Sequence, residues 1–289
     1  MAHDRRAGIL VLCALALVLV STASLVGIVM DDGGALQRIT SLRGQAVEVY
    51  GGRGPYRSDS VAKAVAFRGF DWANLVVCLP LSVLGVVLYR RGRLRGQLIL
   101  VAVFTYLAYN YLIGVMGNAF NGLFLVWTAL FSVGTFGTAL TLAGIDARVV
   151  PERLAVGFPR RTLAVYLVVL GAVLLSQHLG LILTAYVTGQ PPAPLEHYTT
   201  LELSALELGI MVPLHVVGGV LLWRRHAWGY LIAIPLAFAA AMTFIALTIG
   251  QVLLYRSFGE DNLGAVIQMT VFAIVAAGLS FLAFLRVKE

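Results

Sequence analysis

The sequence predicts an all-α membrane protein, a multi-pass bundle of eight transmembrane helices with both termini in the cytoplasm. Of its 289 residues, 60% are hydrophobic and only 12% are charged, and the mean hydropathy is +0.89. Charged residues make up about a quarter of a typical soluble domain. Eight apolar stretches have the roughly 20 residues that a helix needs to cross a bilayer, and clusters of arginine alternate with them.

The expected spans are residues 8–30, 72–89, 97–117, 122–145, 162–187, 203–223, 228–254 and 263–285. The first span follows Arg5 and Arg6 and contains small residues at 21–24, features that a cleaved signal peptide shares. Because its apolar run continues to Met30, the full length of a span, we expect this helix to be retained.

The basic residues predict the orientation. Loops 118–121 and 188–202 contain no lysine or arginine, whereas 14 of the 21 basic residues flank the spans on the other side: Arg5, Arg6, Arg90, Arg91, Arg93, Arg95, Arg148, Arg153, Arg160, Arg161, Arg224, Arg225, Arg286 and Lys288. Cytoplasmic loops retain positive charge, so the arginine-rich side is expected to face the cytoplasm of a bacterial-type cytoplasmic membrane. This interleaving also accounts for the net charge of +7. The expected partner is therefore the lipid bilayer and not a nucleic acid.

The chain aligns with itself after a shift of 133 residues. The shift matches Pro80 with Pro213, Gly85 with Gly218 and Gly96 with Gly229. We predict a tandem duplication of a four-helix unit, with halves at 1–150 and 151–289. An even number of spans in each half gives both the same orientation.

The long first loop, residues 31–71, distinguishes the first half from the second, and we expect it to form an ordered lid on the outer side. Residues 61–67 are expected to form a short amphipathic helix capped by Asp59 or Ser60. Arg57 and Arg68 are suited to receive an anionic group, or else they pair with carboxylates of the loop.

Asp71 is the loop residue nearest to the expected cavity. Residues 56–60 read Tyr-Arg-Ser-Asp-Ser, and 68–71 read Arg-Gly-Phe-Asp. This pairing is similar to a pattern in bacterial multi-pass membrane proteins, and the resemblance implies no activity.

Polar side chains inside the spans are the candidate functional residues, because such groups are costly in lipid and usually face the bundle interior or a water-filled cavity. They are Tyr109, Asn110, His178, Glu207 and His215. Most of them fall in the outer half, which predicts an outward-facing polar pocket. His178 and Glu207 lie within about 8 Å of each other in depth. Their pairing would join two helices, or Glu207 would carry a proton or contact a ligand.

No cofactor is assigned from the sequence. His178 and His215 lie at depths that permit a haem between two imidazoles, but there is no Cys-x-x-Cys-His attachment motif. Four residues of types that suit zinc or iron follow no known ligand spacing and are only weak metal candidates: His178, His197, Glu202 and Glu207.

We therefore expect a membrane protein that binds or transports a small ligand in an outward-facing polar pocket. Two alternatives stay open. One is an intramembrane enzyme that acts at the outer leaflet on a lipid-like or quinone-like substrate through Glu207 and His178. The other is a non-catalytic accessory subunit of a larger membrane complex. No motif decides between a small-molecule and a lipid ligand, between enzyme and transporter, or between a homo-oligomer and a larger complex.

Overall fold

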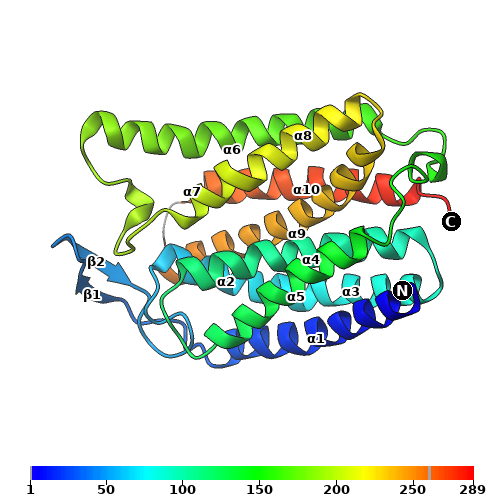
Figure 1. Ribbon diagram of the computed structural model, residues 1–289. Coiled ribbons are helices and arrows are strands. Elements are labelled where there is room, and N and C mark those ends of the chain that lie inside the picture. The colour runs from blue at the N-terminus through cyan, green and yellow to red at the C-terminus, as the bar shows by residue number, and fades with distance from the viewer. Residues whose placement is uncertain (1, 260–261) are drawn as a thin grey trace.

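The computed structural model describes residues 2–259 and 262–289, and within them eight helices are long and apolar enough to cross a membrane. The helices run along one common direction (Figure 1). A small β-hairpin lies at one end of the bundle, and the start of the first helix and the end of the last lie at the other. The chain thus has the predicted character of a multi-pass helical membrane protein.

The elements follow the chain in a simple order. Residues up to Leu142 form α1 (Ala2–Val29), β1 (Gln37–Thr40), β2 (Ala46–Val49), α2 (Val61–Ala73), the π-helix η1 (Asn74–Cys78), α3 (Leu79–Arg90), α4 (Leu94–Gly117) and α5 (Phe124–Leu142). The following residues form η2 (Pro151–Arg153), α6 (Arg160–Thr188), η3 (Ala193–Leu195), α7 (Glu202–Leu206), the π-helix η4 (Glu207–Met211), α8 (Val212–Trp223), α9 (Ala227–Phe258) and α10 (Leu263–Leu285). Two spans are composite: α2, η1 and α3 form one, and α7, η4 and α8 form another.

The second span is longer than the sequence predicts, because it begins at Val61 and not at residue 72. The predicted capping at Ser60 is present, since its side chain accepts a hydrogen bond from the backbone N–H of Lys63. The helix expected at 61–67 does not stop there but continues into the membrane-spanning part. The lid therefore ends at residue 60. It also contains an antiparallel hairpin, β1–β2, which the sequence analysis did not predict.

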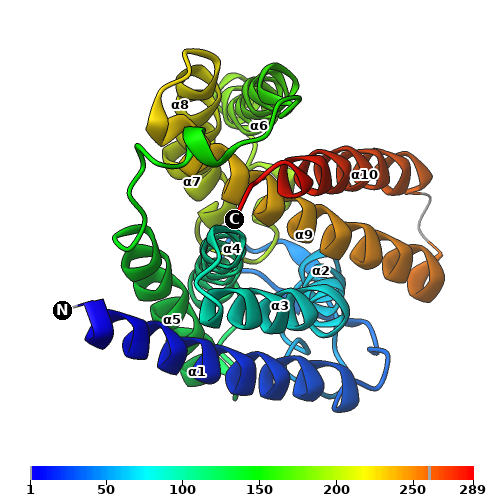
Figure 2. The same ribbon diagram turned by 90° about the vertical axis from the view of Figure 1, so that its right-hand side faces the viewer.

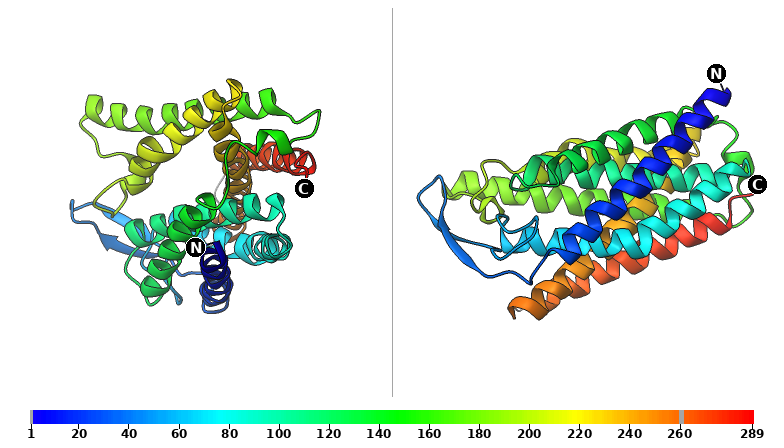
Figure 3. Two further views of the ribbon diagram at one scale, coloured as in Figure 1. Left: turned by 45° about the vertical axis from the view of Figure 1, so that its right-hand side comes forward. Right: turned by 90° about the horizontal axis from the view of Figure 1, so that it is seen from below.

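Two central helices, α4 and α9, organise the bundle. In the second view, α4 lies near the centre, between α1 on one side and α6 and α8 on the other (Figure 2). The α4 and α9 spans are the most buried of the eight, at 72% and 61%, whereas the α6 span is 17% buried. Helix α1 runs obliquely across the outside of the bundle (Figure 3). The peripheral helices therefore present apolar side chains outward, as a lipid-exposed surface requires.

A glycine contact joins α2 to α9. A Cβ atom added to Gly69 would lie 2.3 Å from the carbonyl oxygen of Ala246, and one added to Gly250 would lie 3.0 Å from Cα of Ala66. The two backbones can approach this closely only because both positions lack a side chain. The contact holds the helix that carries the lid against one of the two central helices.

Several local features recur at the same 133-residue shift that relates the two sequence stretches. The π-helical turns η1 and η4 begin at Asn74 and Glu207. A Cβ atom on Gly96 would lie 2.2 Å from the backbone nitrogen of Tyr89, and one on Gly229 would lie 2.3 Å from that of Leu222, the residues at equivalent positions. The turn before each of these helices has a positive φ, 74° at Gly92 and 60° at Arg225.

The α2–α9 contact predicts the effect of a single methyl group. We expect Gly69→Ala to lower the free energy of unfolding by about 2 kcal/mol or more, because the new Cβ overlaps the backbone of α9 at Ala246 and Gly250. Gly180→Ala is the matched control, since a Cβ there meets no atom within 4 Å. Thermal unfolding in detergent checks this. Equal melting temperatures for the two variants would contradict a close backbone contact between α2 and α9.

Candidate functional site

Glu207 opens the π-helical turn η4 and is buried, with 6% of its surface exposed. The hydroxyl of Tyr109, on α4, donates a hydrogen bond to its Oε1. Its Oε2 is also buried and has no hydrogen-bond partner among the described residues. A π-helical turn is uncommon and is frequent at functional sites. The carboxyl group is therefore held on one side and free on the other.

Asn74 occupies the equivalent first position of η1, but its side chain is fully used. Its Nδ2 donates to Oγ of Ser24 at 3.1 Å and to the hydroxyl of Tyr111 at 3.2 Å. The hydroxyl of Tyr106 donates to its Oδ1 at 2.9 Å. These partners come from α1 and α4, so Asn74 joins three helices. It differs from Glu207 in having no free polar atom.

Asp71 is packed inside the bundle, with 4% of its surface exposed. The hydroxyl of Tyr56, in the lid, donates to its Oδ2 at 2.6 Å. A Cβ atom on Gly27 would lie 1.9 Å from the same oxygen, so α1 reaches this carboxyl only through a glycine. The sequence placed Asp71 nearest to a cavity. In the structure it is covered by Tyr56 and by α1, which indicates a role in attaching the lid.

The two histidines in the spans have separate partners. Nδ1 of His178 lies 3.0 Å from Oγ of Ser204. Nδ1 of His215 lies 2.7 Å from the carbonyl oxygen of Met211, and since a carbonyl only accepts, this nitrogen carries the proton. Nε2 of His215 is then a bare acceptor, buried without a partner among the described residues. Of the two alternatives for His178 and Glu207, the pairing of one with the other is not observed, since His178 bonds to Ser204 and Glu207 to Tyr109.

The weak metal candidates are dispersed. The ring of His197 packs on Tyr198 with ring centroids 4.2 Å apart, and Glu202 forms an ion pair with Lys63 at 2.6 Å. Over residues 2–259 and 262–289, no group of three or more His, Cys, Asp or Glu side chains is arranged to hold a metal ion. Asn110, beside Tyr109 on α4, is buried and its Oδ1 has no partner in this part of the chain.

Lys63 ties the lid-bearing helix to the second half of the chain. Its Nζ donates to Oε1 of Glu202 and to the carbonyl oxygen of Gly117, both at 2.6 Å. It also lies 3.6 Å from the centroid of the Tyr198 ring, a cation–π contact. One ammonium group thus connects the ends of α2, α4 and α7.

Asp59, in the lid, is the acceptor for a second set of contacts at the same end. It accepts hydrogen bonds from the backbone N–H of Ala119 at 2.7 Å, from Nδ2 of Asn118 at 3.2 Å and from the hydroxyl of Tyr198 at 3.0 Å. Its side chain is fully buried. Burial raises the pKa of this carboxyl from 3.8 to about 6 despite those hydrogen bonds.

The two arginines predicted to meet an anion have different environments. Nε of Arg68 lies 2.5 Å from Oδ2 of Asp31 in an ion pair, and its Nη1 donates to the hydroxyl of Tyr50 at 2.8 Å. Arg57 is exposed on the lid. Arg68 therefore follows the second of the two expectations, pairing with a loop carboxylate.

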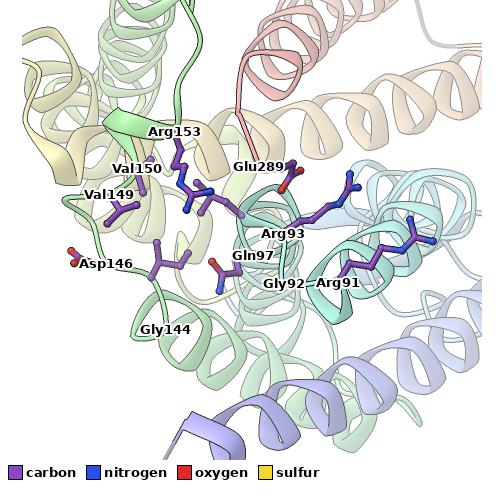
Figure 4. Close-up of a pocket in the computed structure, with 12 residues that line it drawn as sticks. Arg91, Gly92, Arg93, Gln97, Gly144, Asp146, Val149, Val150, Arg153 and Glu289 are labelled. Atoms are coloured by element: carbon purple, nitrogen blue, oxygen red, sulfur yellow. The ribbon is translucent and has the colours of Figure 1, made fainter.

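A hollow of about 440 Å³ lies at the arginine-rich end, opposite the lid (Figure 4). The residues that line it are Arg91, Gly92, Arg93, Leu94, Gln97, Gly144, Ile145, Asp146, Val149, Val150, Arg153 and Glu289. This hollow was not predicted from the sequence, where the arginines were interpreted only as markers of topology. The available signal was their placement at the ends of helices that the bundle brings together.

A scan of protein-family models, a search of curated proteins and a search of solved structures each found no match to this chain. The class of protein therefore rests on the eight apolar helices, which fit a multi-pass membrane protein. Any more specific function has to be argued from the side chains described above.

Asp59 predicts a pH-dependent stability. Its pKa of about 6 in the folded protein lies above its ordinary value, so the folded state favours the protonated form. The contribution of Asp59 to stability is thus greatest at low pH and is lost as the pH rises toward and above 6. Because Asn does not titrate, the melting temperature of the wild type relative to Asp59→Asn should fall between pH 4.5 and pH 7.5.

The expected change corresponds to about 1 to 3 kcal/mol, since one pKa unit is about 1.4 kcal/mol. Thermal unfolding in detergent at several pH values measures it. Glu48→Gln, on the exposed hairpin, controls for the loss of one carboxyl group. A difference between wild type and Asp59→Asn that is constant with pH would show that burial does not govern this carboxyl.

Proposed function

We propose that the protein binds or transports a small ligand within the membrane and that Glu207 contacts the ligand or carries a proton. The observation that supports this is the buried Oε2 of Glu207, which lacks a partner in the described residues while Oε1 accepts from Tyr109. Leaving a buried acceptor unpaired costs about 1 to 3 kcal/mol. Ionisable groups at such positions mark substrate and proton pathways in membrane proteins.

The chemistry of the free oxygen defines the ligand class. A carboxylate oxygen accepts hydrogen bonds and attracts positive charge. The ligand is therefore one that presents an N–H or O–H donor or a cationic group, and a proton on Glu207 replaces it when the site is empty. The acid–base pair of an intramembrane enzyme is less favoured, because the imidazole of His178 pairs with Ser204.

The proposal includes a tandem duplication, with halves at 1–150 and 151–289. Its support is the recurrence of the π-helical turns, of the close glycine contacts and of the positive-φ turns at one constant shift. Duplicated units are frequent in transporters. In such a pair, Asn74 and Glu207 occupy equivalent positions. The saturated Asn74 would be the structural copy, and the half-satisfied Glu207 the functional one.

The proposed orientation places the arginine-rich end in the cytoplasm of a bacterial-type cytoplasmic membrane, with both termini on that side. Glu207 lies five residues beyond Glu202, which bonds to Lys63 near the lid. That separation is about 7.5 Å along a helix. In this orientation Glu207 belongs to the outer half of the membrane, and an outward-facing pocket would reach it from the lid side.

We expect Glu207→Gln to weaken ligand binding by about 10- to 100-fold, because it removes the charge from the free oxygen. The probes are alkali-metal cations, primary amines and quaternary ammonium salts. Each is tested for its effect on the melting temperature of the full chain in mild detergent. Native mass spectrometry of the same samples records any small molecule that stays bound.

Glu202→Gln is the matched control, because it removes the same charge from the other end of α7. At least one probe or retained molecule should stabilise the wild type and Glu202→Gln but not Glu207→Gln. The proposal is wrong if every stabilising probe acts equally on Glu207→Gln, or if the wild type carries no added mass above 31.0 kDa and no probe stabilises it.

A further inference from the structure

The hollow at the arginine-rich end lies between two ordered walls. One wall contains Arg153, and a β-bridge between Leu154 and Val287 fixes it to the end of the chain. The backbone N–H of Ala155 donates to the carbonyl oxygen of Arg286 at 2.7 Å. The backbone N–H of Lys288 donates to the carbonyl oxygen of Arg153 at 2.6 Å. This pairing holds the position of Arg153.

The opposite wall is the turn between α3 and α4. Gly92, at the centre of this turn, has a φ of 74°, and its N–H donates to the carbonyl oxygen of Tyr89 at 2.9 Å. A glycine in this left-handed conformation ends a helix without steric cost. The turn places Arg91 and Arg93 on either side of Gly92, and both line the hollow.

The charges inside the hollow are unbalanced. Arg91, Arg93 and Arg153 form no side-chain hydrogen bond or ion pair with any residue in 2–259 or 262–289. Of the two acidic residues of the lining, Glu289 lies 3.4 Å from Nε of Arg95 in an ion pair, and Asp146 accepts a hydrogen bond only from the neutral backbone N–H of Arg148 at 3.0 Å. Three unpaired arginines against one such carboxylate leave an excess of positive charge in the hollow. The lining side chains come from separate segments; Arg153 reaches down from one side, whereas Arg91 and Arg93 extend outward on the other side (Figure 4).

A second hollow of about 210 Å³ extends this positive region. It shares Gly92, Gln97 and Gly144 with the first and adds Arg5 and Arg6, at the start of α1. Both added arginines donate to backbone carbonyl oxygens, Arg5 to Ala143 at 2.7 Å and Arg6 to Arg90 at 2.5 Å. Arg5 and Arg6 hold the start of α1 in place and add to the positive potential of the site.

We propose that this hollow binds an organic phosphate, whose negative charge is attracted by the exposed guanidinium groups of Arg91, Arg93 and Arg153 that line it. Guanidinium groups pair with phosphate in a bidentate manner, which is why arginine is favoured at such sites. The volume of about 440 Å³ is in the range of small-molecule sites and leaves room for more than a phosphate ion. The amide of Gln97 is placed in the lining for the polar remainder of the ligand.

Two sources carry this chemistry. The hollow opens where the helices end, so the headgroup of an anionic phospholipid fits it from the membrane surface. A soluble phosphorylated compound fits it from the aqueous side. The probes are dioleoylphosphatidylglycerol for the first, glycerol 3-phosphate for the second and dioleoylphosphatidylcholine as the zwitterionic reference.

Arg91→Ala and Arg153→Ala, singly and combined, are compared with Arg224→Ala by native mass spectrometry of the full chain in mild detergent. Arg224 is the counterpart of Arg91 at the 133-residue shift; it is exposed and outside the lining of the hollow. We expect each single variant to bind about five- to tenfold more weakly, and the combined variant more weakly still. Melting temperatures without ligand show whether each variant is folded.

Preference for phosphatidylglycerol, lost in the Arg91 and Arg153 variants but kept in Arg224→Ala, supports the proposal with a lipid source. The same pattern with glycerol 3-phosphate supports it with a soluble source. The proposal is overturned by equal binding of phosphatidylglycerol and phosphatidylcholine, by equal weakening in Arg224→Ala, or by the binding of neither anionic probe.

Discussion

The hydrocarbon interior of a bilayer offers no hydrogen-bond partner, and every polar group inside this bundle is subject to that constraint. The backbone meets it by forming helices, and most buried side chains meet it by pairing with each other. Asn74 has three such partners, and Asp71 is bonded by the hydroxyl of Tyr56. Other buried polar atoms in the described residues also lack a partner, among them Oδ1 of Asn110 and Oγ1 of Thr141, but of these atoms Oε2 of Glu207 is the one that belongs to a carboxyl group.

The same constraint explains how the lid is attached. Arg68 and Asp71 lie on a membrane-spanning helix, where charge is costly. The lid supplies their partners. Asp31 and Tyr50 bind Arg68, and the hydroxyl of Tyr56 donates to Asp71. Lid and helix are therefore mutually dependent, since the polar residues of α2 need the lid and the lid is positioned by them. At the lid end of the bundle, Lys63 and Asp59 extend this connection to segments of other helices and loops.

The spans were predictable from the sequence because apolar length is a local property, and seven of the eight begin and end within several residues of the helices observed. The exception, the start at Val61, was missed because Arg68 and Asp71 interrupt the apolar run. Their partners lie far away in the chain, so no window of residues reveals that these charges are satisfied. The partner of Glu207 was missed for a related reason. Depth in the membrane can be counted from the sequence, but the rotation of each helix, which directs Glu207 to Tyr109 and His178 to Ser204, depends on packing.

The two ends of the bundle show how a repeated local structure can support different chemistry. The π-helical turn that holds Asn74 inside a saturated network presents Glu207 with one free oxygen. Arg91 lines the hollow and its counterpart Arg224 does not, although both side chains are exposed. In both pairs the backbone is alike and the neighbouring helices differ. The number of partners that surrounding helices supply, and not the local fold, thus decides which polar group remains available for a ligand.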